Sequence, residues 1–340
     1  MPDHAVVIGI NSYPGMRNLL GPCQDAEEFL KWVTRPGPGG VEPGNVHKLL
    51  STDFPPETDF RDAQPVCDQI INMFEEILDG NPVKHDIGNR LYVFVAGHGM
   101  SDVNRPESAA LIAANASTHS ISVPHVVVTD YVHYFRRIYA FKEIILVMDC
   151  CLDAVVQRPL DVKSFLQAPP HPKASQVKMF LAKATVWSKR SYEKEFNGVV
   201  RGIFSVALME ALANAPAKEN RVTGKAVKEY IDQNIKRIAG NQTIEDPTIN
   251  GRKYDEIIFY QRPAEAPHTD PLFTLTVKVS GAVDGAEVTL FDGNLVLAET
   301  KPVTNRTAVF HVTPGMYKVE LPGTDRKSLL EIVGDHEEIL

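Results

Sequence analysis

Cysteine is scarce in this sequence, and long apolar runs are absent. The four cysteines, at positions 23, 67, 150 and 151, are too few to form the disulfide framework of a 340-residue chain. They also lack the paired Cys-x-x-Cys spacing of a zinc site. No run of about 18 apolar residues could span a membrane, and the N-terminus shows neither region of a secretory signal. We therefore expect a protein of a reducing, cytoplasmic compartment, with no membrane partner and no metal.

Basic residues are also in the minority. Lys and Arg number 35 against 43 Asp and Glu, which gives a formal net charge of -8. A nucleic-acid partner calls for a basic face, so this balance disfavours one. The chain is 44% apolar and 23% charged, as is usual for a globular protein with a sizeable core. Its length exceeds the ~100–200 residues of one domain, so one large or two unequal domains are expected.

Short apolar runs alternate with longer amphipathic ones over residues 1–261, which we interpret as one domain. Strands are predicted at 4–10, 46–50, 91–96, 143–148 and 178–184, and helices at 25–33, 62–78, 130–139, 203–213 and 223–238. This alternation predicts an α/β fold, a mostly parallel sheet with helices on both faces. In such sheets the functional residues gather at the carboxyl ends of the strands.

The pattern changes after a Pro-rich stretch at 262–271, which we interpret as a linker. From 272 to 340 the apolar residues recur with period two. Gly, Asn and Pro turns separate the short strands predicted at 273–279, 286–291, 295–300, 307–312 and 317–321. We expect a small C-terminal all-β sandwich domain, which carries no cluster of catalytic residue types.

Two strand ends carry side chains capable of chemistry. One strand runs into Gly97-His98-Gly99, and another into Asp149-Cys150-Cys151. A histidine between glycines is also common in tight turns, and a lone cysteine is usually a small buried apolar residue. The pair is more informative, because the two strand ends would meet if their strands are neighbours. An imidazole beside a thiol makes the reactive thiolate available at neutral pH.

These segments resemble the caspase and metacaspase family of cysteine peptidases. The Gly-His-Gly and Asp-x-Cys elements stand about 50 residues apart, as they do in caspases. The resemblance extends over roughly 4–260 and implies a caspase-like sheet. Further matching segments are 8–13 (IGINSY), 20–26 (LGPCQDA), 202–205 (GIFS) and 207–212 (ALMEAL).

The resemblance implies a catalytic dyad that needs no cofactor. Cys151 would attack the scissile carbonyl, His98 would protonate the leaving amine, and the backbone N–H groups of Gly99 and Cys151 would bind the oxyanion. The sequence indicates no third catalytic residue. Metacaspases usually read Asp-Ser-Cys-His-Ser-Gly, whereas here Leu152 follows the nucleophile, and Cys150 remains an alternative thiol.

The resemblance also bears on specificity. Metacaspases cut after Arg or Lys and line their pocket with acids, and Asp149 and Asp25 match two of these positions. Buried carboxylates recognise a guanidinium by paired charge-assisted bonds. The structural alternatives are a helix N-cap for Asp25 and a strand-end turn for Asp149.

We therefore predict a cysteine endopeptidase that cleaves protein substrates after Arg or Lys and that has an activating or regulatory protein as a further partner. Bacterial members of the family often serve stress or defence systems, and the resemblance carries that role over. The main alternative is an inactive caspase-like scaffold or adaptor that binds a protein partner. A flavodoxin-like or receiver module is a weaker alternative, because it gives no reason for His98 and Cys151 to occur together. Calcium binding by Asp59, Asp62 and Asp153 is less favoured than solvated surface acids.

Overall fold

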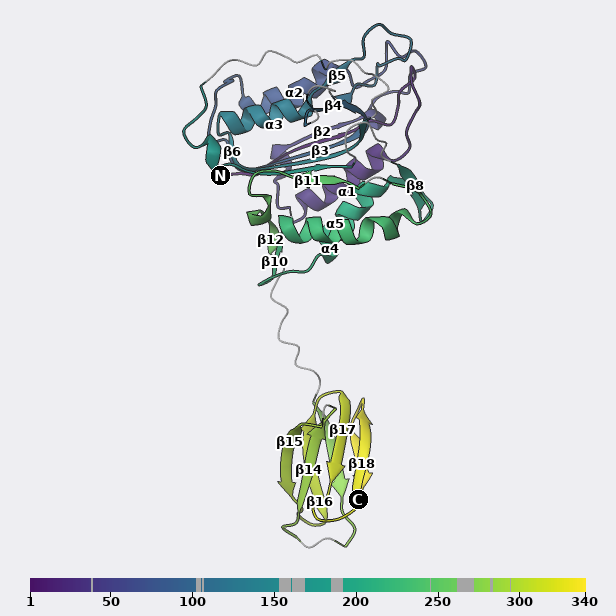
Figure 1. The fold of residues 1–340 in the computed structure, drawn as a ribbon, viewed down its shortest axis with the longest axis vertical. Helices are drawn as coiled ribbons and strands as arrows, with labels where there is room; N and C mark the ends of the chain where they lie inside the picture. The colour runs from purple at the N-terminus through teal and green to yellow at the C-terminus, as the bar shows by residue number, and fades with distance from the viewer. Residues whose placement is uncertain are drawn as a thin grey trace. The chain divides into compact units, whose positions relative to one another are not determined.

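The computed structural model describes residues 1–37, 39–101, 105, 107–152, 160, 169–184, 192–244, 246–261, 272–281, 284–293 and 295–340. The side chains of Cys151 and Leu152 and the predicted linker 262–271 lie outside this described part. The chain divides into two compact units, Met1–Pro263 and Ala264–Leu340 (Figure 1).

The first unit is built on an eight-stranded sheet with the order β11-β7-β6-β3-β1-β2, in which β4 pairs with β3 and β5 with β4. The neighbouring strands from β2 to β7 are all parallel, as the sequence predicted. The pairs β11–β7, β3–β4 and β4–β5 are antiparallel. The strands are His4–Gly9 (β1), Val46–Leu50 (β2), Gly88–Ser101 (β3), Ala109–Ile112 (β4), His125–Val126 (β5), Phe141–Leu152 (β6), Lys178–Lys183 (β7) and Thr248–Asn250 (β11).

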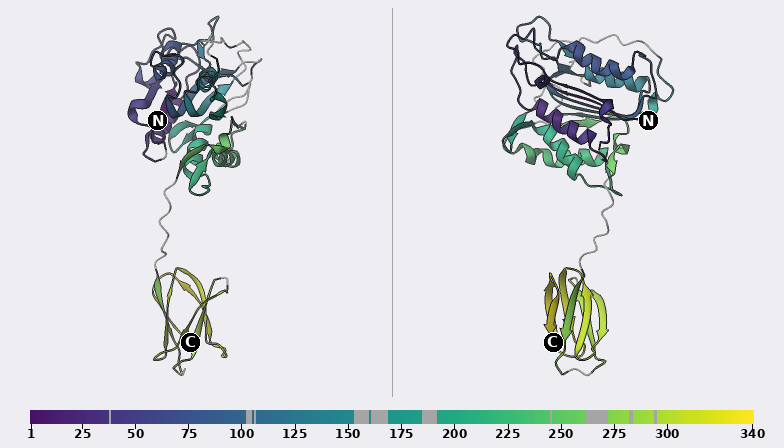
Figure 2. Two further views of the ribbon diagram at one scale, coloured as in Figure 1. Left: turned by 90° about the vertical axis from the view of Figure 1, so that its left-hand side faces the viewer. Right: turned by 180° about the vertical axis from the view of Figure 1, so that it is seen from behind.

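Helices cover both faces of this sheet (Figures 1 and 2). Successive strand residues alternate between the faces, so Val6 and Ile8 join one buried cluster and Ala5 and Val7 the other. The first cluster includes α2 and α3, and the second includes α1, α4 and α5. The prediction of a mostly parallel sheet with helices on both faces is thus confirmed. The helices are Pro22–Thr34 (α1), Cys67–Leu78 (α2), Val128–Arg137 (α3), Ile203–Asn214 (α4) and Gly224–Ala239 (α5).

The two strands that carry the candidate dyad are longer than predicted. β3 does not end at Gly97, because its last residues from Gly99 to Ser101 pair with β4. β6 likewise continues to Leu152 and stays paired with β3. The histidine and the tandem cysteines therefore lie inside paired strands rather than in turns after them.

Other elements depart from prediction for local reasons. α2 begins at Cys67 rather than at 62, because a residue before a proline is disfavoured in a helix and Gln64 precedes Pro65. The short strands Glu193–Phe196 (β8) and Val199–Gly202 (β9) form a separate hairpin that the sequence analysis did not find. Arg221–Thr223 (β10) and Ile258–Gln261 (β12) form a further small pair. One-turn 3-10 segments lie at Pro43–Asn45 (η1), Ser51–Asp53 (η2), Ala174–Gln176 (η3) and Tyr254–Glu256 (η4).

The second unit consists of two packed sheets, of three strands (β16-β13-β19) and four strands (β15-β14-β17-β18). Their inner faces share a core that includes Leu275, Phe310 and Val319. The last two strands were not predicted, and β19 pairs parallel with β13, so the sheets are not wholly antiparallel. The strands are Phe273–Lys278 (β13), Glu287–Asp292 (β14), Leu297–Pro302 (β15), Thr307–Val312 (β16), Gly315–Glu320 (β17), Lys327–Ile332 (β18) and His336–Ile339 (β19).

No helix in the described ranges is both long and apolar enough to cross a bilayer.

We predict that residues 1–263 fold without the second unit. The clusters of the first unit extend no further along the chain than Tyr260, and the core of the second unit begins at Phe273. Both tryptophans, Trp32 and Trp187, belong to the first unit, so tryptophan fluorescence reports on that unit alone. The truncated protein should unfold in urea in one cooperative transition, with the same midpoint as the tryptophan signal of the full chain. A soluble 1–263 protein without a cooperative transition would show that the second unit supports the sheet.

Candidate active site

The β3–β6 pairing brings the two candidate catalytic residues to one place. In this parallel register His98 is the partner of Cys151, Gly97 of Cys150 and Ala96 of Asp149. The two strands are therefore neighbours, which is the condition that the sequence analysis set for these residues to meet. All these residues lie near the carboxyl ends of their strands, where functional residues of parallel sheets gather.

The His98 ring is held by contacts from one loop. Its Nε2 lies 2.7 Å from the carbonyl oxygen of Arg17, and its ring meets that of Tyr13 edge-on, with centroids 4.6 Å apart. Because a carbonyl can only accept, Nε2 carries the proton and donates. In the neutral imidazole the other nitrogen, Nδ1, is then the proton acceptor.

Tyr13 also fixes the backbone at this point. It is fully buried, and its hydroxyl donates to the carbonyl of Ile112 (3.1 Å) and accepts the N–H of His98 (3.0 Å). A Cβ on Gly97 would lie 2.6 Å from that hydroxyl oxygen, which explains the need for glycine before the histidine. Tyr13 is thus the positioning residue of the imidazole.

The two adjacent cysteines differ in their surroundings. Cys150 is 1% exposed and packs in the cluster on the α2 and α3 side of the sheet, with its Sγ 3.8 Å from the carbonyl oxygen of Val95. A structural thiol buried in apolar surroundings is unreactive, which disfavours Cys150 as the working nucleophile. Cys151 is placed through its backbone, directly across from His98.

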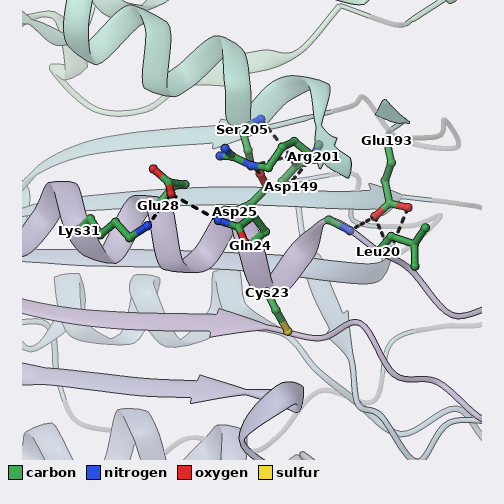
Figure 3. A network of polar contacts seen from close by, with 12 residues as sticks. Leu20, Cys23, Gln24, Asp25, Glu28, Lys31, Asp149, Glu193, Arg201 and Ser205 are labelled. Carbon is green, nitrogen blue, oxygen red and sulfur yellow. Dashed lines mark hydrogen bonds and ion pairs between the residues drawn. The ribbon is translucent and has the colours of Figure 1, made fainter. Parts of the chain in front are cut away.

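The two predicted pocket acids are buried and close together (Figure 3). Asp149 is 7% exposed, and its Oδ2 accepts hydrogen bonds from the N–H (3.0 Å) and hydroxyl (2.7 Å) of Ser205 in the first turn of α4. Asp25 is 2% exposed; its Oδ2 accepts the N–H of Gly202 (2.7 Å), and its Oδ1 accepts the Nε–H of Arg201. Neither alternative reading holds, since the N-cap of α1 is Gly21 and Asp149 lies within β6.

Gly202 lies between the two acids. A Cβ at this position would be 2.1 Å from Oδ2 of Asp149 and 3.0 Å from Oδ2 of Asp25. Only a glycine allows the backbone of β9 to approach both carboxylates. The acids therefore converge although they come from α1 and β6.

These acids line a small pocket of about 30 Å³ next to His98. A third carboxylate, Glu193 of β8, also belongs to its wall. Glu193 Oε1 accepts the backbone N–H groups of Gly21 (2.7 Å) and Leu20 (3.0 Å), just before α1. The lining residues are Leu19, Pro22, Asp25, Ala96, Gly97, Asp149, Glu193 and Gly202.

The electrostatics of the pocket centre on Asp25. Burial, followed by the negative charge of Asp149, raises the pKa of Asp25 to about 7. The Arg201 guanidinium and the Gly202 N–H act in the opposite direction without cancelling this rise. Asp25 is consequently close to half protonated at neutral pH.

Several site residues were missed by the sequence analysis. Tyr13 lies in the quoted segment 8–13, but nothing in that segment indicates a contact with His98. A backbone carbonyl such as that of Arg17 has no signature in sequence. Glu193 and Arg201 lie on the unpredicted hairpin, so they could not be placed at the pocket.

The described residues contain no group of three His, Cys, Asp or Glu side chains able to hold a metal ion. Asp59 instead forms an ion pair with Arg61 (2.5 Å), and Asp153 lies outside the described residues.

We predict that Asp25 destabilises the fold when it ionises. Because its folded pKa of about 7 lies above the unfolded value of 3.8, the unfolded state loses its proton first as the pH rises. Neutral Asp25 contributes its full share to the free energy of unfolding below about pH 4. This contribution falls by roughly 4 kcal/mol as the pH rises from about 4 to about 7. Asp25→Asn should remove this pH dependence.

The measurement is urea unfolding of both proteins between pH 4 and 8, followed by tryptophan fluorescence. The advantage of the wild-type protein over the variant should shrink as the pH rises. An advantage that grows with pH would mean that Arg201 stabilises the carboxylate more than burial penalises it.

Comparison with known proteins agrees with this architecture. A family model described as the caspase domain matches residues 2–254. Caspase-1 from Spodoptera frugiperda has a similar fold, at 14% identity and a TM-score of 0.50, over 76% of this chain and 92% of that one. The structure of pro-sf-caspase-1 matches with 13% identity and a TM-score of 0.45, over 73% and 90% of the two chains. A search of curated proteins finds no match. With the family model spanning the whole parallel sheet, the chain belongs to the caspase domain family of cysteine peptidases.

Proposed function

We propose that this protein is a cysteine endopeptidase that uses His98 and Cys151 and cleaves after Arg or Lys. The observation that carries the proposal is the β3–β6 register, in which these two residues are direct partners. Family membership supplies the reaction class, and the burial of Cys150 leaves Cys151 as the thiol for the reaction.

The contacts of His98 support its role as the acid and base. With Nε2–H donated to the Arg17 carbonyl, Nδ1 is the nitrogen that exchanges a proton with the thiol. The Cys151 sulfur attacks the carbonyl carbon, and the N–H groups of Gly99 and Cys151 stabilise the oxyanion. The imidazolium then protonates the leaving amine as the C–N bond breaks. In the second half, water attacks the thioester, His98 takes the water proton and the thiol is released.

The charges of the pocket support a basic substrate residue. Asp25, Asp149 and Glu193 lie around a space that begins at Gly97, the residue before His98. The lining thus contributes three carboxylates, of which Asp25 is paired with Arg201. A lysine or arginine side chain is attracted by such a site, whereas an aspartate is repelled.

The cysteines support a reducing compartment. Four cysteines are too few for the disulfide framework of a 340-residue chain. We infer a cytoplasmic enzyme that acts on protein substrates under the control of a regulatory protein. The stress or defence role rests on family resemblance alone.

We predict that Cys151→Ala abolishes peptide hydrolysis, by more than about 10³-fold, because it removes the nucleophile. Cys150→Ala is the matched control: it removes a neighbouring buried thiol and should retain most of the activity. Iodoacetamide should label one fast-reacting thiol, which mass spectrometry identifies as Cys151. If Cys150→Ala loses activity and Cys151→Ala does not, the nucleophile is Cys150 instead of Cys151. The absence of any fast-reacting thiol would favour the inactive scaffold.

We also predict that fluorogenic peptides identical except for the residue before the bond are cleaved after Lys or Arg and not after Asp. Asp149→Ala should lower kcat/KM for the basic peptides by about 10²-fold, because one charge-assisted contact is lost. Asp149→Asn keeps the shape of the side chain and should lower kcat/KM for the basic peptides by nearly as much. Faster cleavage after Asp than after a basic residue would contradict the assignment of the pocket, whatever the fate of the dyad.

A further inference from the structure

The loop of residues 10–21, between β1 and α1, holds His98 in place. It carries the Arg17 carbonyl, which accepts the Nε2–H of the imidazole, and the Tyr13 hydroxyl, which accepts the backbone N–H of His98. Because both contacts come from this one loop, the position of the loop sets the orientation of the ring.

The loop is tied together by its own hydrogen bonds. The backbone carbonyl of Asn11 accepts the N–H of Leu19 (2.9 Å), and the side-chain amide of Asn11 donates to the carbonyl of Leu20 (3.2 Å). The side-chain carbonyl of Asn18 accepts the N–H of Tyr13 (2.6 Å). A displacement of the loop at Leu20 is therefore transmitted through these bonds to Tyr13.

The far end of the loop is held by a side chain of the β8–β9 hairpin. Glu193 Oε1 accepts the backbone N–H groups of Gly21 (2.7 Å) and Leu20 (3.0 Å), and its Oε2 lies 3.3 Å from the Leu20 nitrogen (Figure 3). A Cβ on Gly21 would lie 3.0 Å from Oε1 of Glu193 and 3.1 Å from the Cα of Arg201. The hairpin thus packs directly against the loop, and a charge-assisted contact joins the two.

The hairpin is itself anchored to a second helix. Lys194 Nζ donates to the carbonyls of Ile238 (3.1 Å) and Ala239 (3.3 Å) at the end of α5. Glu193 and Lys194 therefore bind the start of α1 and the end of α5, each with the sign of charge that the helix dipole favours. Since Glu193 and Gly202 also line the pocket, the hairpin connects the pocket wall with the loop that holds the imidazole.

We propose that Glu193 is a positioning residue for His98, which links the hairpin beside the substrate pocket to the loop that orients the imidazole. The inference rests on the proposed function, because it concerns the same reaction. The property that matters is the carboxylate oxygen as acceptor of two N–H groups, rather than the negative charge that Glu193 adds to the pocket wall. Loss of this acceptor releases the end of the loop, and the Arg17 carbonyl then no longer fixes the ring. The chemical step slows, because proton transfer requires a defined orientation of the imidazole.

Two substitutions separate the acceptor from the charge. Glu193→Asp keeps the charge, but its side chain is one methylene shorter, so its oxygens no longer reach both N–H groups. Glu193→Gln keeps an acceptor oxygen at the same reach and removes the charge. The Asp variant should lower kcat by about tenfold with little change in KM. The Gln variant should keep kcat within about twofold and raise KM for the Lys and Arg peptides.

Glu195→Asp and Glu195→Gln are the matched controls, because Glu195 is an exposed carboxylate on the same strand and should leave both constants unchanged. A Glu193 that contributes only charge would give the opposite order, with KM raised in the Gln variant and both constants unchanged in the Asp variant. A purely structural Glu193 would lower the melting temperature of the Asp variant without changing kcat per folded molecule. Either result overturns the inference, and so does an equal loss of kcat in the Asp and Gln variants.

A spectroscopic measurement separates this inference from the peptidase proposal. Nuclear magnetic resonance of ¹⁵N-labelled histidine reports the tautomer of each ring at about pH 8.5, where histidine side chains are ordinarily neutral. The spectra are recorded in Cys151→Ala, with and without Glu193→Asp, and the His98 signals are assigned by their loss in His98→Gln. Cys151→Ala should show the Nε2–H tautomer of His98, and the added Glu193→Asp should give a mixture of both tautomers.

This change in the His98 signals supports the inference even if the wild-type protein hydrolyses nothing, in which case only the peptidase proposal fails. Hydrolysis after basic residues, with His98 signals that Glu193→Asp does not alter, leaves the peptidase standing and overturns the positioning role of Glu193.

Discussion

The parallel pairing of β3 with β6 is the constraint on which the site depends. The two strands stay in register from Gly88 and Phe141 to Gly99 and Leu152. Both faces are covered by helices, so nearly every side chain in the pair is buried, and apolar burial fixes the pairing. Because the histidine, the tandem cysteines and Asp149 lie at the end of that register, the same pairing fixes their backbone positions. Core packing thereby fixes the backbone positions of His98 and Cys151, whereas the loop residues Tyr13 and Arg17 hold the His98 ring.

The site lowers the stability of the fold through its acids, because two carboxylates lie together in the buried region where α1, β6 and β9 meet. A buried charge is stable only when it is paired or hydrogen-bonded. Here a guanidinium, a glycine N–H and a serine at the start of α4 bind the two carboxylates. The pKa of Asp25 nevertheless stays near 7, so the requirement is only partly met. Strongly shifted pKa values of this kind cluster at functional sites, and structural ion-pair networks produce them as well.

The sequence was sufficient for the parts of the molecule that depend on local patterns. Runs of apolar residues located β1, β2 and β7 almost to the residue, because buried parallel strands are continuously apolar. Prediction from the sequence failed where a segment's structure depends on partners distant along the chain. Nothing local indicates that Gly99 to Ser101 find a partner in β4, or that the polar segment from Glu193 to Gly202 forms a hairpin. Glu193, Arg201 and the Arg17 carbonyl were missed for that reason, since each acts only through residues distant along the chain.

The tandem cysteines reveal how the strand register is protected. If β6 slipped by one residue along β3, Cys150 would become the partner of His98, and a thiol would still stand opposite the imidazole. The slip would also move the β6 side chains that now pack against α2 and α3, such as Met148 and Leu146, to the opposite face of the sheet, because side chains alternate along a strand. The β6 side chains of the two hydrophobic clusters, one on each face of the sheet, would then have to change places. Which of the two cysteines lies opposite His98 is therefore fixed by the apolar side chains of β6, which pack in the core.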